Sequence, residues 1–74
     1  MKIFHERLKE TLKQKKVSQN ELAKRIGVRQ NAVWEWCNVG TPSVERLKQI
    51  CEILNVSADF LLGLSINTGG GADI

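Results

Sequence analysis

The chain has 74 residues, a net charge of +3 and 42% apolar residues, a composition that suits one small domain with a single core. Only 5% of residues are aromatic, with one proline and no tyrosine, so a β-sandwich is not expected. No apolar run reaches the roughly 18 residues of a membrane span, and the charged N-terminus is unlike a signal peptide. Two cysteines and one histidine predict neither a disulfide scaffold nor a metal site. We therefore expect a cytoplasmic protein with free thiols and no cofactor. The pI near 9.1 is compatible with a polyanionic partner but does not require one.

The first segment with helical periodicity runs from 3 to 15. Phe4, Leu8 and Leu12 recur every four residues, with charged residues between them, as on the apolar face of a helix. The lone His5 is interpreted as solvated helix surface. Lysines gather at the end of this segment, where they are either a solvated charge run or a patch that steers the protein toward a polyanion: Lys13, Lys15 and Lys16.

The second segment, 18–26, is a short predicted helix. Ser18 and Glu21 fit a capping box, in which each side chain binds a free backbone N–H. Gly27 suits a left-handed stop, because it lacks a Cβ. The small Ala23 would let another helix cross closely at this point.

The third predicted helix, about 29 to 37, holds both tryptophans and is followed by a loop over 38–43. Val33 and Trp36 lie three residues apart and share a face, so both are assigned to the core. The side chains that a helical wheel directs away from this face are Asn31, Trp34, Glu35 and Asn38.

A fourth helix is expected to begin near Ser43 and to close at Asn55. Its predicted apolar face consists of Val44, Leu47, Ile50, Cys51 and Leu54. Ser57 can cap a last helix, 58–62, that ends at Gly63. The domain would then span 1–64, and the glycine-rich stretch 65–74 is expected to be a flexible tail. The prediction is an all-α fold of five short helices.

Two helices around Gly27 form the most informative pattern. The motifs Ser-Gln-x-x-Leu-Ala at 18–23, Gly-Val at 27–28 and Pro-Ser at 42–43 resemble those of the lambda-repressor-like helix-turn-helix family of the Cro/XRE type, and the similarity extends from Arg7 to Leu62. This resemblance implies a five-helix DNA-binding domain that inserts its third helix into the major groove, usually as a homodimer on a palindrome.

The resemblance also implies roles for individual residues. Gln30 and Asn31 match positions from which members of the family read bases, and an amide side chain can pair with adenine. Glu35 could accept a hydrogen bond from cytosine, or it could have a solvated or intramolecular role. The expected contacts to the DNA backbone are Gln19, Arg29, Asn38 and Thr41, and Gln19 should also support Gln30. The expected dimer contact consists of Phe60, Leu61, Leu64 and Ile66.

Trp34 has three competing explanations, because an indole on an exposed helical face is costly. It could touch thymine methyls and sugar edges in the groove, pack on another segment of this chain, or belong to a protein interface. The sequence leaves all three open.

Several residues depart from the family pattern. Cys37 replaces a glutamate that is often paired with a basic residue at the position of Leu12, so both ends of that ion pair have become apolar. Val39 replaces the usual glycine, and Gly40 follows one residue later, so the loop over 38–41 is expected to run differently from that of the family. Cys51 stands where the family has alanine and is interpreted as a small core residue.

Two classes of function follow. The first is a sequence-specific DNA-binding regulator, with repression as the expected mode. The second is a protein-interaction module on the same fold, such as the antitoxin of a toxin–antitoxin pair, in which Trp34 would anchor a partner. An enzyme with a small-molecule substrate is not expected, because no catalytic constellation or phosphate-binding glycine loop is present.

Overall fold

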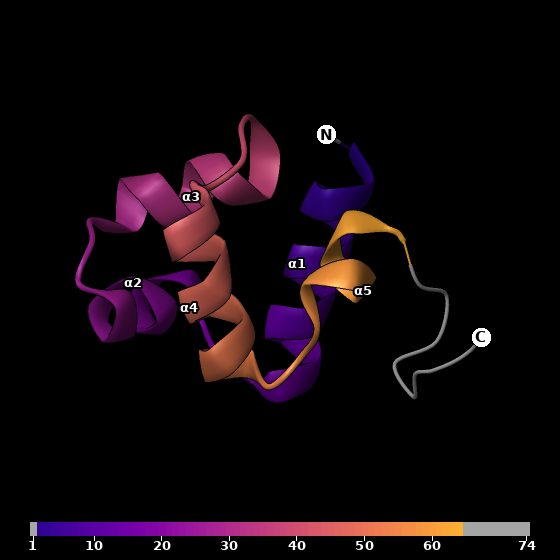
Figure 1. Cartoon of the computed structure of the whole chain (residues 1–74). Coiled ribbons are helices and arrows are strands. Elements are labelled where there is room, and N and C mark those ends of the chain that lie inside the picture. The colour runs from indigo at the N-terminus through magenta and orange to yellow at the C-terminus, as the bar shows by residue number, and fades with distance from the viewer. Residues whose placement is uncertain (1, 65–74) are drawn as a thin grey trace.

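The computed structural model describes residues 2–64, and this part of the chain is built from α-helices joined by short turns, without a β-strand (Figure 1). The helices are α1 (Lys2–Lys15), α2 (Gln19–Ile26), α3 (Gln30–Asn38), α4 (Val44–Leu54) and α5 (Ala58–Leu62). The predicted all-α, five-helix fold is confirmed, and each helix starts and ends within one residue of its expected position. The expected flexible tail, 65–74, lies outside the described residues.

Serine hydroxyls begin three of these helices. The Oγ atoms of Ser18, Ser43 and Ser57 each accept a hydrogen bond from the backbone N–H three residues further on, at 3.0, 3.3 and 3.1 Å. Such a cap satisfies one of the free N–H groups of the first turn and typically contributes about 1 kcal/mol. The boundaries of α2, α4 and α5 therefore follow from local chemistry.

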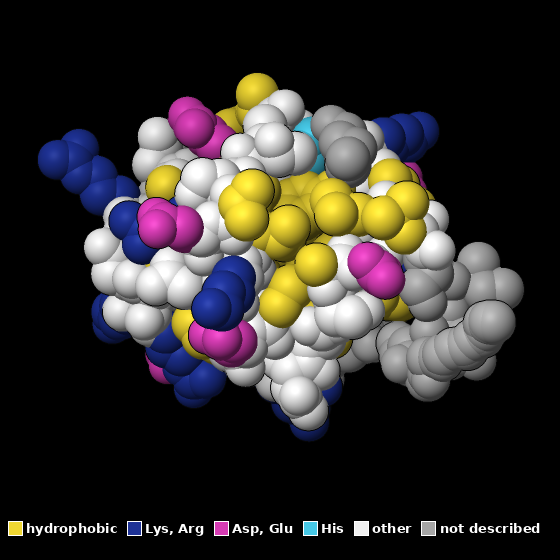
Figure 2. Space-filling view, viewed as in Figure 1, with side chains coloured by type: hydrophobic (Ala, Val, Ile, Leu, Met, Phe, Trp, Pro, Cys, Tyr) yellow, Lys and Arg dark blue, Asp and Glu magenta, His cyan; other side chains and the backbone are white. Residues whose placement is uncertain are grey.

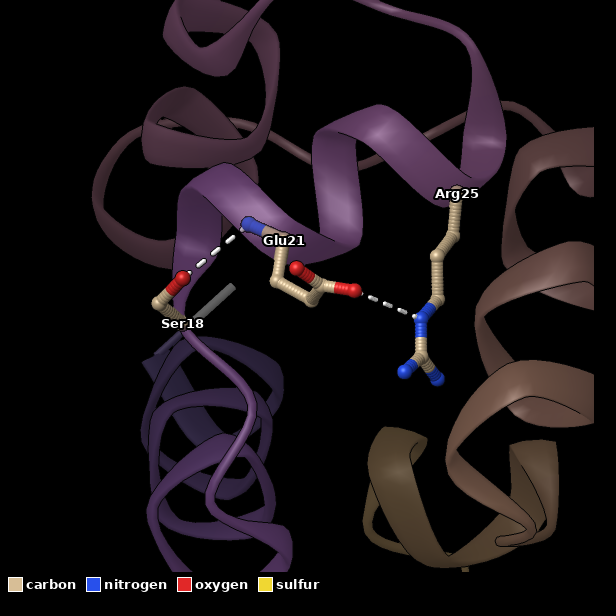
Figure 3. A network of polar contacts seen from close by, with 3 residues as sticks. All are labelled: Ser18, Glu21 and Arg25. Carbon is tan, nitrogen blue, oxygen red and sulfur yellow. Dashed lines mark hydrogen bonds and ion pairs between the residues drawn. The ribbon is translucent and has the colours of Figure 1, made fainter.

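The capping box predicted at α2 is only half formed. Ser18 accepts from the Glu21 N–H as expected, but the Glu21 carboxylate turns along the helix and pairs with Arg25 Nε at 3.1 Å (Figure 3). The prediction of a reciprocal contact was wrong because an arginine one turn further on offers a charged donor.

The described helices end in a common way. In each, an N–H just beyond the helix donates to a carbonyl five residues earlier: Val17 to Leu12, Val28 to Ala23, Gly40 to Glu35, Val56 to Cys51 and Leu64 to Asp59. This closure usually needs one residue with a left-handed backbone. Lys16, Gly27, Asn55 and Gly63 have φ values of 59°, 91°, 58° and 80°.

One hydrophobic core joins the helices. Its buried apolar residues are Phe4, Leu8, Leu12, Leu22, Ala23, Ile26, Val33, Trp36, Cys37, Ile50, Leu54 and Leu61. The apolar face predicted for α4 is confirmed from Leu47 onward but was wrong for Val44, which is 84% exposed. Helical spacing gives the direction of a side chain, but it does not say whether another element covers that end of the helix.

The helices pack so that α3 has one buried and one free side. α2 and α1 both pack against α3, while α1 also contacts α4 and α5. None of the described helices is long and apolar enough to cross a membrane.

Candidate nucleic-acid interface

The turn between α2 and α3 sets the position of the candidate interface. Gly27 adopts φ +91°, and its N–H and that of Val28 both donate to Ala23 O, at 2.8 and 3.0 Å. A Cβ built at Gly27 would meet nothing within 4 Å, so the glycine is required by backbone conformation alone. Arg29 then begins α3 without a side-chain hydrogen bond to the first turn.

The exposed face of α3 brings three of the predicted base-reading residues together. Gln30, Asn31 and Trp34 line one open depression of the surface, and 48% of Trp34 remains exposed. Glu35 is exposed on the same helix but does not line the depression. Packing within this chain therefore covers only part of the surface of the Trp34 indole.

The buried side of α3 holds the helix in place. Val33 and Cys37 are fully buried and Trp36 is only 9% exposed, which confirms the assignment of Trp36 to the core. The two tryptophans therefore differ in kind, because one anchors the helix and the other presents an aromatic surface.

The residues expected to contact the DNA backbone surround this helix. Arg29, Asn38 and Thr41 are exposed, and Gln19 is half-buried at the start of α2. Asn38 Nδ2 donates to Trp34 O at 2.9 Å, which leaves one of its amide hydrogens for another acceptor. In the described part of the chain, no hydrogen bond joins Gln19 to Gln30, and the expected support of Gln30 by Gln19 stays a prediction.

His5 has a role that the sequence did not reveal. Its Nε2 atom lies 2.7 Å from Gly40 O, in the loop between α3 and α4. The interpretation of His5 as solvated surface was wrong: the ring is half-buried and ties α1 to that loop. No local pattern could have revealed this contact, because its partners lie 35 residues apart.

Comparisons with known proteins agree with this geometry. The helix-turn-helix family profile matches residues 8–61, which is most of the chain. The chain belongs to the Cro/C1-type helix-turn-helix family. This is a family of DNA-binding regulators and not of enzymes.

Similar relatives of this helix-turn-helix protein include transcriptional regulators of three mobile elements. They are the HTH-type transcriptional regulators for the conjugative elements R391 of Providencia rettgeri, SXT of Vibrio cholerae and pMERPH of Shewanella putrefaciens. Each is 36% identical over an alignment 81 positions long, which covers 100% of this chain and 38% of the relative. The chain therefore spans well under half of the length of these relatives.

The two residues that replace the family's ion pair between α1 and α3 lie in the apolar core, as expected. Leu12 is 5% exposed and Cys37 is 0% exposed. Burial raises the pKa of the Cys37 thiol from 9.0 to about 11, and the charge of Lys9 opposes part of that rise. A thiol with a raised pKa is mostly protonated and unreactive at neutral pH, so Cys37 is suited to packing.

The residues expected at a dimer contact of this helix-turn-helix protein fall into different environments. Leu61 is fully buried in the core of the monomer, so in this conformation it is not available to a partner. Phe60 is half-buried, Leu64 is 75% exposed, and Ile66 lies outside the described residues. The sequence pattern did not separate Leu61 from Leu64, because it does not show which of the two side chains the other helices cover.

Proposed function

We propose that this protein is a sequence-specific DNA-binding transcriptional regulator that inserts α3 into the major groove. The observation that carries this proposal is the gathering of Gln30, Asn31 and Trp34 around one depression on the exposed face of α3, while the opposite face is anchored in the core. In helix-turn-helix domains, residues near the start of the second helix reach the base edges most easily, and Gln30 and Asn31 open α3.

The chemistry of these side chains suggests what they read. The carboxamides of Gln30 and Asn31 can each pair with adenine N6 and N7, while the Trp34 indole offers an apolar surface to a thymine methyl group. Glu35 can accept from cytosine N4 but would be repelled by nearby phosphates. The proposed half-site is therefore rich in A·T pairs, with a C·G pair where Glu35 reaches.

The proposed backbone contacts position the domain and carry no sequence information themselves. Arg29 supplies a charge at the start of α3 and Gln19 an amide at the start of α2. Asn38, the last residue of α3, and Thr41, in the loop that follows, supply polar groups at the other end. The net charge of +3 favours approach to DNA, and its contribution should weaken as salt rises.

We further propose that the protein acts in the cytoplasm as a homodimer on a palindrome, with half-sites about 34 Å apart, and represses by excluding polymerase. An apolar face supports a dimer: hydrophobic side chains gather between α4 and α5 (Figure 2). The exposed apolar residues near these elements include Val44 at the start of α4, Leu64 just beyond α5 and Ile3 at the start of α1. A Cβ built at Gly63 would lie 3.0 Å from Ile3 Cγ1, so the start of α1 and the end of α5 adjoin.

A protein-interaction module, such as an antitoxin, is the second candidate. The exposed indole of Trp34 favours it, since partly exposed tryptophans are frequent anchors of protein interfaces. The two candidates differ in what Trp34→Ala should do. The substitution should weaken DNA binding if Trp34 reads DNA, but should spare DNA binding and abolish a protein contact if Trp34 anchors a partner.

Selection of duplexes from a random pool at near-physiological salt tests the proposal, because nonspecific attraction is weak under that condition. The expected result is an enriched inverted repeat of constant spacing, with Gln30→Ala and Asn31→Ala each relaxing the preference at particular positions. The control is Lys13→Gln, which removes one charge from the lysines at the end of α1. It should weaken binding to every sequence alike. Failure to enrich any motif would refute operator recognition by this chain alone.

A further inference from the structure

The loop between α3 and α4 is held at a single residue, Gly40, by two hydrogen bonds on successive peptide groups. Gly40 N–H donates to Glu35 O at 2.8 Å, which closes the end of α3. Gly40 O lies 2.7 Å from His5 Nε2. Because a carbonyl oxygen only accepts, His5 Nε2 must carry the proton and donate it. Gly40, whose N–H closes α3, is thus also tied to α1 through its carbonyl oxygen.

This tie fixes the direction of the next backbone donor. The Gly40 carbonyl and the Thr41 N–H belong to one planar trans peptide and point in opposite directions. With Gly40 O directed at α1, the Thr41 N–H is directed away from it. Thr41 N–H donates to no other described atom of the chain, and Pro42, which follows, has no N–H to offer.

The Thr41 N–H therefore has the properties of a phosphate ligand. It belongs to an exposed residue three positions beyond the last residue of α3, within about 11 Å of the helix end even if the chain is fully extended. Phosphates line both edges of the groove that α3 would occupy, and backbone N–H groups are common partners for them.

We infer that His5 is a positioning residue for DNA binding: by holding Gly40 O, it orients the 40–41 peptide so that the Thr41 N–H meets a DNA phosphate. The inference rests on the proposed insertion of α3 into DNA. His5 also gives α1 a polar connection to the loop that follows α3, whereas the buried Leu12 and Cys37 are both apolar.

Three substitutions separate the hydrogen bond from the bulk of the ring. His5→Gln places an amide nitrogen at about the reach of Nε2, whereas His5→Asn carries the same group on a side chain one carbon shorter. His5→Ala removes the donor altogether. Gln14→Ala, at an exposed position of the same helix, is the control for altering the surface of α1.

The experiment measures two quantities for each variant. The first is backbone amide relaxation of residues 39–43 in the free protein, and the second is the dissociation constant for the selected duplex and for an unrelated duplex. His5→Ala and His5→Asn should make the loop more mobile and weaken binding to both duplexes by about threefold to tenfold, leaving their ratio unchanged. His5→Gln and Gln14→Ala should stay within about twofold of the wild type.

A single methylphosphonate scan of the duplex adds a readout that a general loss of stability would not alter. Neutralising the phosphate opposite Thr41 should weaken the wild type but leave His5→Ala nearly unaffected. Equal losses for both proteins, or an unchanged loop in His5→Ala, would overturn the inference. If the wild type selects no duplex, the proposed function fails, and loop mobility in the free protein still decides whether His5 orders the peptide.

Discussion

The guanidinium of Arg7 lies over the ring of Phe60, with its carbon 4.6 Å from the ring centroid, and Nη1 donates to Phe60 O at 2.9 Å. One side chain of α1 thus holds both the ring and the backbone of α5. A helix of five residues has too few internal hydrogen bonds to be stable alone, so α5 depends on such contacts.

Replacing Arg7 should therefore loosen α5. A charged hydrogen bond and a partly exposed cation–π contact together suggest a loss of about 1–2 kcal/mol of unfolding free energy for Arg7→Ala. Arg7→Lys keeps the charge but loses the planar guanidinium, so it should lose most of this amount as well. Urea denaturation measures both, and a destabilisation of under about 0.3 kcal/mol in Arg7→Ala would contradict the role assigned to the contact.

Lys16 ends α1 with φ 59°, a conformation that costs an L-residue roughly 1–2 kcal/mol. Lys16→Gly removes this strain but adds roughly 0.5–1 kcal/mol of backbone entropy to the unfolded chain. We expect a net stabilisation of about 0.5–1 kcal/mol in thermal or urea denaturation. Asn55→Gly, at φ 58°, is the matched control and should gain less, because asparagine tolerates this region well. A destabilised Lys16→Gly variant would show that the lysine side chain stabilises the turn.

Burial of Cys37 makes stability depend on alkaline pH. The thiol has a pKa of about 11 in the folded protein against 9.0 in the unfolded chain, so the unfolded chain loses this proton first. The stabilisation is complete below pH 9 and is lost as the pH rises through about 11, by up to about 2–3 kcal/mol.

A comparison of the wild type with Cys37→Ala isolates this effect from the titration of lysines, which both proteins share. The unfolding free energy of the wild type minus that of the variant should be constant up to about pH 8.5, where the unfolded thiol begins to ionise. At higher pH this difference should fall, because only the wild type loses stability through the thiol. A difference that does not change with pH would mean that the buried thiol ionises as easily as a free one. Burial also raises the pKa of Cys51, and Glu52 adds to the rise. Cys51 is present in both proteins, so its contribution cancels.

Trp34 should make binding sensitive to a single methyl group of the DNA. Replacing the contacted thymine by uracil removes only the 5-methyl group, and burial of one methyl is worth about 0.8 kcal/mol, or about fourfold in the dissociation constant. The wild type should show this loss at one thymine of the half-site, whereas Trp34→Ala should bind both duplexes equally. If Trp34→Ala binds DNA as tightly as the wild type, the indole belongs to another interface.

Much of the fold could be predicted from local patterns. Ser18, Ser43 and Ser57 begin helices because a hydroxyl satisfies a nearby N–H, and Gly27 and Gly63 end them because they adopt positive φ. Trp36 was assignable to the core and Trp34 to the surface from their spacing to Val33 alone. Each of these relationships joins residues within one helix or turn, where sequence separation and spatial separation correspond.

What the tertiary structure decided involves partners that are distant in sequence. His5 meets Gly40, and Arg7 meets Phe60, across 35 and 53 residues, and no local spacing predicts either pair. Val44 was misjudged for the same reason, and the burial of Leu61 in the monomer was not foreseen. Whether an apolar side chain at a helix end is covered depends on which other element reaches it. The sequence by itself determined the helices, their boundaries and the exposed face of α3. The packing of α1 against α3 and α5 determined which side chains hold the loop and the last helix in place, because these contacts form only when the helices pack together.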